Sequence, residues 1–325
     1  MGQIGRLIAV GIGKETTRGT AVAPDFYIPL TDFDFDDKAE VAVQEGRRAR
    51  IEASYGGDVV KKWAEGNMEG NIYSDSFGLV LLSALGGLST AANADGSGNV
   101  YDHTYSVQNG NTHQSLTLST EDAEAGDKEY AGVVVTSLEI TGEEGSYVKF
   151  SAGLMGNSET GSTETSSFST EYPFRPQDLT FKLASAVSGL SGASAVGIKS
   201  FTLSIEKNVE ANWNLGSLTP SEFYNKQFSV QLEIELIHTG DTYRDLFIAG
   251  TSRAFLLSLV NSDVTIGTAA NPQLDITLAS GQITDWVRNQ GNDDIVTETL
   301  TIRCDYSTSE SSLISAVLTN LTSSY

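Results

Sequence analysis

The chain has 325 residues, with 20 Lys or Arg against 42 Asp or Glu, so the formal net charge is −22. This charge argues against a protein that wraps nucleic acid or docks on anionic lipid, because both functions need a basic surface. The single cysteine, Cys304, excludes an intrachain disulfide framework and a cysteine-based zinc site, and three histidines leave little for a histidine metal site. With no signal peptide and no apolar run of membrane-spanning length, the sequence predicts a soluble protein of a reducing cytoplasm, without metal or cofactor.

Apolar and polar residues alternate along much of the chain, which is typical of half-buried β-strands. The clearest cases are Phe201–Ile205 and Phe228–Leu236, where every second residue is apolar. Gly, Asn, Asp and Ser separate these runs at short intervals, which favours antiparallel sheets over βαβ units. The sequence therefore predicts a mainly β fold, with further strands at Val133–Ile140, Tyr147–Ala152, Leu179–Leu183, Phe255–Val260, Leu274–Leu278 and Glu298–Cys304.

Helical signals are few and short. Ser and Asp residues precede Phe77–Leu85, and a glycine pair follows it, so a capped helix is expected there. Thr242 is expected to cap a second helix over Tyr243–Ala249. Apolar residues at helical spacing from Leu313 to Leu321 predict a third helix at the C-terminus. These helices are expected to cover sheet faces.

Composition suggests how the chain is divided. A polar tract without a core pattern at 158–170 is the expected linker between a first module, 1–157, and a second, 171–325. Residues 88–132 show no pattern shared with the rest, which predicts an insertion or a decoration of the outer surface. Within them, Ala91–Asn99 is a Gly, Ser and Asn tract typical of a loop.

The same order of elements occurs twice in the chain, with similar lengths and little residue identity. Each copy has a short apolar segment, a charged stretch, a loop, an alternating strand and a capped helix, which indicates two diverged copies of one β-rich module. The first copy comprises Phe33–Phe35, Asp36–Glu45, Gly46–Gly57, Ala64–Ile72 and Phe77–Leu85. The second comprises Phe201–Ile205, Glu206–Glu210, Ala211–Glu222, Phe228–Leu236 and Tyr243–Ala249.

The repeated strand has a polar face that is acidic or amide-bearing and lacks Lys and Arg in both copies. One interpretation is the ordinary wet side of an antiparallel sheet. Another is a surface kept free of cations so that a polyanion such as duplex DNA passes without binding, since each cation–phosphate contact adds affinity. The residues of this face are Glu65, Asn67, Glu69 and Asn71 in the first copy and Gln231, Glu233 and Glu235 in the second.

Patterns that resemble catalytic sites do not carry the required residues. Gly11–Lys14 resembles part of a phosphate-binding loop, but Glu15 follows it where Ser or Thr is needed. Neighbouring carboxylates arise by chance among 42 acidic residues, so no acid–base pair is inferred. His103 and His113 lie in a strand-poor polar region and are expected to be solvated. We therefore predict that the protein is not an enzyme.

The opening stretch Gly11–Pro24 (GIGKETTRGTAVAP), followed by Tyr27–Leu30 (YIPL), resembles the start of the major tail tube proteins of long-tailed, siphovirus-type bacteriophages. The resemblance covers most of the chain in layout, and the order of its short motifs carries it. It continues through Gly66–Ile72, the capped helix ending Leu85-Gly86, Ile198–Ile205 and Gln231–Leu236.

This resemblance implies a structural virion protein. Members of the family build β-sandwich modules with flanking helices, and inner strands from six modules join a barrel in each ring. Two modules per chain then imply trimeric rings, with hexameric rings as the alternative. If each module gives four inner strands, about 24 strands at ~4.8 Å spacing and ~40° tilt leave a lumen on the order of 38 Å, wide enough for duplex DNA.

The resemblance also implies roles for particular residues. The seven polar-face residues would line the lumen, and DNA would pass them without specific binding. The loops Gly46–Gly57 and Ala211–Glu222 and the N-terminal arm Gly13–Pro24 would bridge successive rings. Contacts with the next ring are assigned to Arg47, Arg48, Arg50 and Trp213.

Partners and location follow from the same resemblance. The chain would assemble with itself, and with the tape measure protein and the tail terminator and tip proteins. It would be made in the cytoplasm of the bacterial host and reside in the virion tail, with no membrane partner.

A carbohydrate-binding β-sandwich of the virion surface is the alternative function, with Trp213 or Trp286 as a platform for stacking sugars. The three tryptophans, the third being Trp63, are dispersed in the sequence, which favours core or interface anchors instead. An acid-dependent glycosidase is a more distant alternative.

Overall fold

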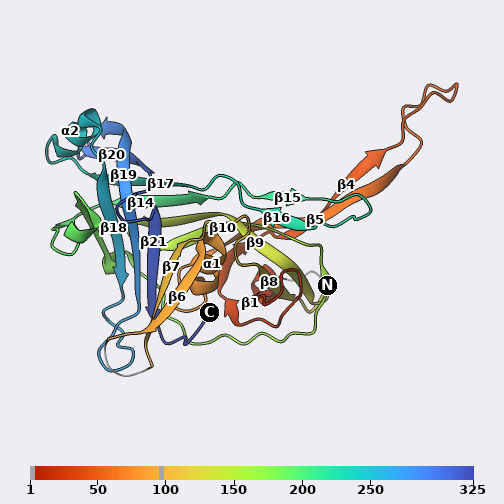
Figure 1. Ribbon diagram of the computed structural model, residues 1–325, viewed down its shortest axis with the longest axis horizontal. Helices are drawn as coiled ribbons and strands as arrows, with labels where there is room; N and C mark the ends of the chain where they lie inside the picture. Colours follow the sequence, from red (N-terminus) through yellow and green to blue (C-terminus); the bar gives the residue numbers. More distant parts are fainter. Residues whose placement is uncertain (1–3, 95–98) are drawn as a thin grey trace.

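The computed structural model describes residues 4–94 and 99–325 and is mainly β (Figure 1). Nineteen strands form one antiparallel network, and two more form a separate hairpin. The strands of the first part are β1 (Ala9–Lys14), β2 (Phe26–Ile28), β3 (Leu30–Phe33), β4 (Asp36–Val43), β5 (Gly57–Asn71), β6 (Gly86–Ala92), β7 (Tyr101–Val107), β8 (Leu116–Glu121), β9 (Lys128–Glu143), β10 (Lys149–Gly156) and β11 (Thr160–Gly161). Those of the second part are β12 (Leu179–Ala184), β13 (Ala195–Val196), β14 (Ser200–Glu206), β15 (Glu210–Asn212), β16 (Glu222–Tyr224), β17 (Ser229–Ile237), β18 (Arg253–Val260), β19 (Gln273–Asn289), β20 (Thr297–Cys304) and β21 (Ile314–Asn320).

The helices are α1 (Phe77–Leu85) and α2 (Thr242–Ala249), with three 3-10 turns, η1 (Gly5–Leu7), η2 (Pro176–Asp178) and η3 (Val187–Gly189). Both α-helices lie where the sequence predicts them, but the expected cap of α2 is wrong. Asp241 is its N-cap, Thr242 is its first residue, and within the described structure neither N-cap side chain makes a capping hydrogen bond. Neither helix in the described ranges is long and apolar enough to cross a membrane.

One row of strands runs through the whole molecule, and we call it the long sheet. β3 and β4 pair in succession with β5, and the row continues through β10, β9, β14, β17 and β20 to the C-terminal half of β19. The contact between β9 and β14 joins the two halves of the chain edge to edge. The long sheet therefore has eight strand positions, four from each half.

A second layer covers one face of the long sheet. The N-terminal half of β9 pairs with β8, which pairs with β1, and the N-terminal half of β19 pairs with β18 and β21. Thus β9 and β19 each cross from one layer to the other. The apolar side chains between the layers form a single large core cluster that includes residues of both halves, such as Met68, Leu138, Leu203 and Leu232.

The two halves repeat the same pairings, including their irregularities. β9 skips Thr136 in its pairing with β10, and β19 skips Thr284 in its pairing with β20. A second bulge interrupts β8–β9 and β18–β19 at corresponding places. Because bulges are specific local features, their coincidence indicates that residues 9–156 and 179–304 follow one topological plan.

The two helices occupy unequal environments. Every residue of α1 is buried, which fits its almost entirely apolar sequence, and Gly86 ends it with a positive φ of 89°. No residue of α2 within the described structure is buried, and Ile248 is 70% exposed. In the described structure, α2 packs mainly against β19.

The prediction of a C-terminal helix at Leu313–Leu321 is wrong, because this segment forms β21. Ile314, Ala316 and Leu318 are buried alternately, and the strand pairs on both sides, with β19 and β7. The apolar residues at helical spacing also satisfy a period of two, and pairing in a sheet decides between the two patterns.

Residues 88–132 contain two parts that pair differently. Their first strands, β6 and β7, form a hairpin that pairs through β7 with β21 and so attaches the first half to the outer layer of the second. β8 and the start of β9 belong instead to the repeated plan. Part of the expected loop at 91–99, residues 95–98, lies outside the described residues.

The prediction that His103 and His113 are solvated is wrong. His103 is fully buried beside Thr90 Oγ1, at 2.9 Å from Nδ1, and the Thr322 carbonyl oxygen, at 2.8 Å from Nε2. His113 is 5% exposed, with its ring nitrogens 3.0 and 2.9 Å from the carbonyl oxygens of Ala84 and Gln108. Burial lowers the pKa of both side chains. Their polar sequence neighbours gave no sign of this, because all of these contacts except that with Gln108 are made by residues at least 13 positions away.

Candidate functional site: a polar sheet face and two hairpins

The seven polar residues predicted to share a role lie on one face of the long sheet, which we call the polar face. The register brings residues of both halves into common rows across the strands. One such row runs through Glu69, Ser151, Glu139, Ser204 and Gln231. The intervening residues of the same strands point into the core, as strand alternation requires. The structure therefore joins the two separate polar patterns of the sequence into one continuous surface.

Strands other than the two of the repeated polar pattern add further acids to the polar face. β9 contributes Glu139, and β14 contributes Glu206, both exposed. Glu139 stands between the buried Leu138 and Ile140, so the alternation that predicts this strand could also have identified it. Glu206 is the last residue of β14, in which buried and more exposed residues alternate in the same way.

The polar face is acid-rich but not free of cations, contrary to the expectation from the repeated strand alone. Lys149 of β10 pairs in register with Asn71, and Arg303 of β20 pairs with Gln231. The Arg303 guanidinium also bonds to Asp305, with Nε 3.0 Å from Oδ1. These two cations, and Lys38 of β4, which pairs with Trp63 on the same face, come from strands outside the repeated pattern.

Neighbouring groups hold two of the acids in place. The indole Nε1 of Trp63 donates to Glu65 Oε2 at 2.9 Å, and Ser151 Oγ donates to Glu69 Oε1 at 3.1 Å. These bonds lie on an exposed or partly exposed surface. They orient the carboxylates without removing their charge from solvent.

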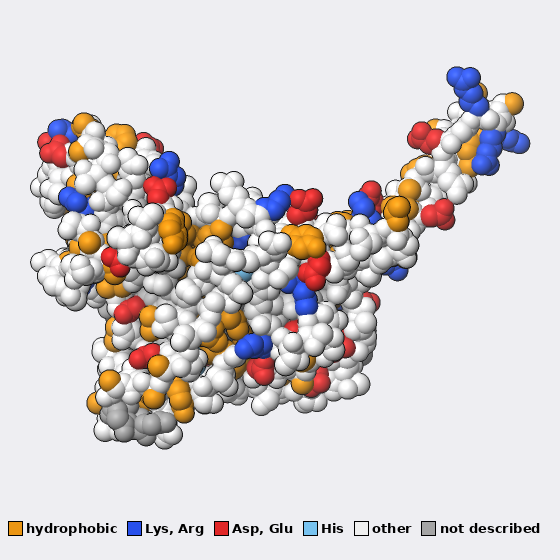
Figure 2. Space-filling view, in the orientation of Figure 1, with side chains coloured by type: hydrophobic (Ala, Val, Ile, Leu, Met, Phe, Trp, Pro, Cys, Tyr) orange, Lys and Arg blue, Asp and Glu red, His pale blue; other side chains and the backbone are white. Residues whose placement is uncertain are grey.

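The hairpin formed by β4 and β5 projects far from the body of the molecule (Figure 1). All residues of β4 are exposed, and the turn at its end carries Arg47, Arg48 and Arg50, all exposed. Figure 2 shows this tip as a cluster of Lys and Arg side chains. Exposed apolar side chains also follow the hairpin, which is unusual for a monomeric surface and favours contact with another chain. They are Val41, Val43, Ile51, Val59 and Val60.

The hairpin formed by β15 and β16 packs against its own chain. The rings of Trp213 and Trp63 meet edge to face, with centroids 5.9 Å apart, and Lys61 Nζ lies 5.0 Å from the Trp213 centroid. The amide of Lys62 donates to the carbonyl oxygen of Leu218 at 2.7 Å. The exposed tip of the hairpin includes Leu215. Trp213, predicted to contact the next ring, is thus at least partly engaged within the chain.

The N-terminal motif also folds back onto its own chain. The carboxylate of Glu15, 3% exposed, accepts four hydrogen bonds. Oε1 accepts from Thr117 Oγ1 and Gly132 N, and Oε2 accepts from Ser115 Oγ and Gly19 N, at 2.6–3.1 Å. The segment 13–24 is therefore a fixed loop between β1 and β2 rather than a free arm.

A buried lysine links the second hairpin to α1. Lys207, 1% exposed, donates from Nζ to the Ser83 carbonyl oxygen at 2.7 Å, near the C-terminal end of the helix, where a donor is favourable. Burial, and to a smaller extent the nearby Arg18, lowers the pKa of Lys207 to about 7. The sequence gave no signal for this contact, which joins residues 124 positions apart.

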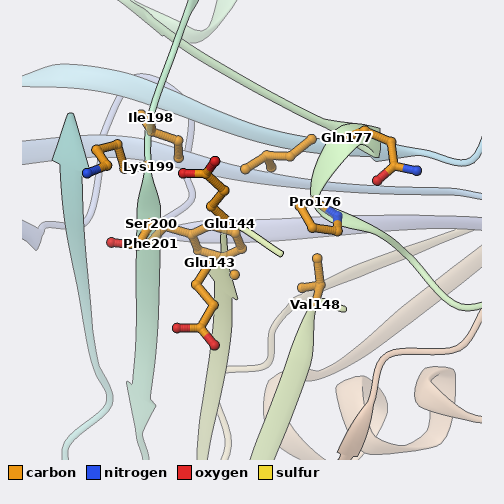
Figure 3. Close-up of a pocket in the computed structure, with 11 residues that line it drawn as sticks. Glu143, Glu144, Val148, Pro176, Gln177, Ile198, Lys199, Ser200 and Phe201 are labelled. Carbon is orange, nitrogen blue, oxygen red and sulfur yellow. The ribbon is translucent and has the colours of Figure 1, made fainter. Parts of the chain in front are cut away.

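A pocket of about 300 Å³ lies where β9 and β14 meet, at the end of the polar face (Figure 3). The carboxylates of Glu143 and Glu144 point in opposite directions, and Lys199 points away from both (Figure 3). Ligand pockets require polar groups that converge on one point, and the polar groups of this pocket do not. Among the described residues, no group of three or more His, Cys, Asp or Glu could hold a metal ion.

Comparison with known proteins identifies the family. No curated protein matches the sequence significantly. The model of a family described as "Phage tail tube protein" matches residues 5–304, which include both halves of the long sheet and both hairpins. The resemblance of the N-terminal motif is thereby confirmed, and the chain belongs to the phage tail tube protein family.

Proposed function

We propose that this tail tube protein forms rings of three copies, and that the polar faces of the copies line a lumen that conducts double-stranded DNA. Each copy would contribute two sandwich modules, with four strand positions of the long sheet from each. Three copies would then supply the 24 strands expected of the barrel. Six copies would give about 48 strands and a lumen roughly twice as wide, so the trimer fits a single duplex better.

The observation that carries the proposal is the continuous acid-rich face of the long sheet. Duplex DNA carries one negative charge per ~1.7 Å of its axis, and each Lys or Arg that neutralises a phosphate adds salt-dependent affinity. Acids outnumber the cations on the face, which include Lys38, Lys149 and Arg303, so the wall would repel DNA weakly and would not retain it. The expected lumen, on the order of 38 Å, would leave a water layer around the duplex.

Stacking of rings is assigned to the long hairpin. Its length carries the tip beyond the rest of the chain, and its exposed apolar side chains and Arg47, Arg48 and Arg50 would bind an adjacent ring. The tip of the second hairpin, near Leu215, would add a smaller contact. The tape measure protein and the proteins that end the tube are the further partners proposed.

The carbohydrate-binding alternative finds no support in its two tryptophans. The ring of Trp213 is contacted by Trp63 and Lys61. The indole Nε1 of Trp286 donates to the buried Glu298 at 2.7 Å, and His238 lies at its edge. Neither presents an open aromatic platform.

The test replaces two acidic residues of the proposed lumen wall with lysine. The variant Glu69→Lys/Glu233→Lys adds two cations to the proposed wall of each copy, and tubes are first verified by negative-stain electron microscopy. A fluorescent duplex DNA that does not sediment with wild-type tubes should then sediment with variant tubes, and retention should fall as salt concentration rises.

The matched control is Glu124→Lys/Glu310→Lys, which makes the same change of net charge on exposed loops outside the polar face. Control tubes should retain at most a small fraction of the DNA held by the lumen variant. Equal retention by both variants would contradict the placement of the polar face in the lumen.

A further inference from the structure

The contact between the two halves of the chain provides a template for the contact between chains. Pairings and bulges place the residues of the halves in correspondence: Leu154 with Ile302, and Thr136 with Thr284. The same correspondence relates Met68 of β5 to Ile234 of β17, through their positions relative to β10 and β20. Phe33 pairs with Met68 and Phe201 pairs with Ile234, so Phe33 corresponds to Phe201. Strand β9 thus corresponds to β19, and the strand pair β3 and β4 corresponds to β14.

Inside the chain, the last strand of the first half pairs with the first strand of the second. β9 and β14 are antiparallel, with Ser204 opposite Glu139 and Glu206 opposite Ser137 on the polar face. On the core side, Leu203 is opposite Ile140. This junction is an internal example of how one module follows another.

The corresponding strands at the two ends of the long sheet have unused edges. β3 and β4 pair with β5 on one side, and the C-terminal half of β19 pairs with β20 on one side; in the described structure neither has a strand on its other side. Edges of this kind promote pairing with another chain. Their side chains are largely exposed, and those of β4 entirely so.

We propose that the C-terminal half of β19 pairs with β3 and β4 of a second copy in the register of the β9–β14 junction. Transfer of that register places Asp36 opposite Val287 and Lys38 opposite Asp285 on the polar face. On the core side it places Phe35 opposite Arg288. The inference rests on the proposed ring and specifies which residues close it.

Charge complementarity supports a second copy as the occupant of these edges. The transferred register sets Lys38 directly against Asp285, and it brings Arg288 diagonally next to Asp37, whose carboxylate also accepts a bond from the Glu159 amide at 3.0 Å. Opposite charges across paired strands stabilise a register, whereas like charges destabilise it. A shift by two residues would place Asp36 opposite Asp285 instead.

Cysteine cross-linking tests the register. The double variant Asp36→Cys/Val287→Cys places two thiols opposite each other only between copies, because within one chain seven strand spacings, about 34 Å, separate them. The native Cys304 is buried, and burial raises its pKa to about 12, so it does not compete. Mild oxidation of assembled tubes should convert most of the protein to a covalent trimer that reduction returns to monomer. The matched control is Asp32→Cys/Val287→Cys, four residues out of register on the same face, and it should cross-link at least tenfold less.

Charge exchange gives a second readout. Lys38→Asp and Asp285→Lys should each reduce the yield of tubes several-fold, and the double variant should restore it. If tubes of the Asp32→Cys/Val287→Cys variant cross-link, or if tubes of the Asp36→Cys/Val287→Cys variant do not, the register is overturned and the tube function stays intact. If the wild-type protein forms no tubes at all, the proposed function fails, and this inference fails with it.

Discussion

At the scale of single residues, the N-terminal motif is explained by one buried carboxylate. Glu15 gathers the loop after β1, strand β8 and the bulge of β9 through four hydrogen bonds. Gly19 has a φ of 73°, and a Cβ on Gly13 would lie 2.5 Å from the Ala23 carbonyl oxygen, so both glycines are required by the backbone. The motif that resembles other tail tube proteins thus encodes a packed loop.

Substitution Glu15→Gln should destabilise the folded chain by about 2 kcal/mol, because an amide nitrogen replaces an oxygen that accepts two hydrogen bonds and leaves a buried N–H without an acceptor. Urea denaturation of the unassembled protein measures this change. Glu310→Gln, at an exposed position, should alter stability by less than about 0.5 kcal/mol. Equal stability of the two variants would show that the carboxylate does not hold the loop.

Lys207 should make stability depend on pH. Its folded-state pKa of about 7 lies below its unfolded value of 10.5, so between these limits the unfolded chain binds the proton and the folded chain does not. The cost of burying the ammonium therefore disfavours folding fully below pH 7, and it is relieved as pH rises toward 10.5, by up to ~5 kcal/mol.

The variant Lys207→Met should lose this dependence. The difference in unfolding free energy between wild type and variant should shift in favour of wild type between pH 7 and pH 9.5, as measured by urea denaturation. Comparing the two proteins cancels the titration of other groups. Parallel stability curves across this range would contradict the assigned role of the buried ammonium.

At the scale of elements, the two hairpins occupy equivalent positions in the chain but differ in what they contact. The hairpin of β15 and β16 lies on its own chain through Ala211 and Phe223, which pack with Val134 and Met155. The hairpin of β4 and β5 leaves apolar and basic groups exposed to solvent. This difference supports the proposal that the longer hairpin makes contacts between rings.

Replacing Arg47, Arg48 and Arg50 together with Glu should shorten the tubes or abolish them, while the unassembled protein stays folded, because the tip makes no contact with the core. Tube length measured by negative-stain electron microscopy tests this. A control with equal change of charge replaces Arg6, Lys182 and Lys199 with Glu and should leave length unchanged. Tubes of normal length in the first variant would remove the hairpin tip from the stacking contact.

Local sequence signals predicted elements whose partners are local and failed where distant strands decide. Apolar residues and a terminal glycine pair identify α1, and alternation identifies β14 and β17. The charged stretch after Phe35 becomes strand β4, because β5 provides a partner that its composition does not indicate. β21 is a strand for the same reason. The polar face could be predicted for two strands, but its continuity depends on the β9–β14 contact, which no local pattern encodes.

At the scale of the whole molecule, the long sheet relates the fold to the proposed assembly. A single core cluster spans both halves, so the eight strand positions form one continuous surface rather than two hinged ones. The division into modules at 158–170 remains a prediction about how the chain is organised. The β6–β7 hairpin, pairing with β21, ties the outer layers of the two halves together.

The central claim is that the acidic face of this sheet becomes the inner wall of a threefold ring. A cryo-electron microscopy reconstruction of assembled tubes tests it most directly. We expect three chains per ring, a closed barrel of about 24 strands, and Glu65, Glu69, Glu233 and Glu235 directed at the central channel. A reconstruction in which these side chains face the outside of the tube, or are packed between chains away from the channel, would contradict it.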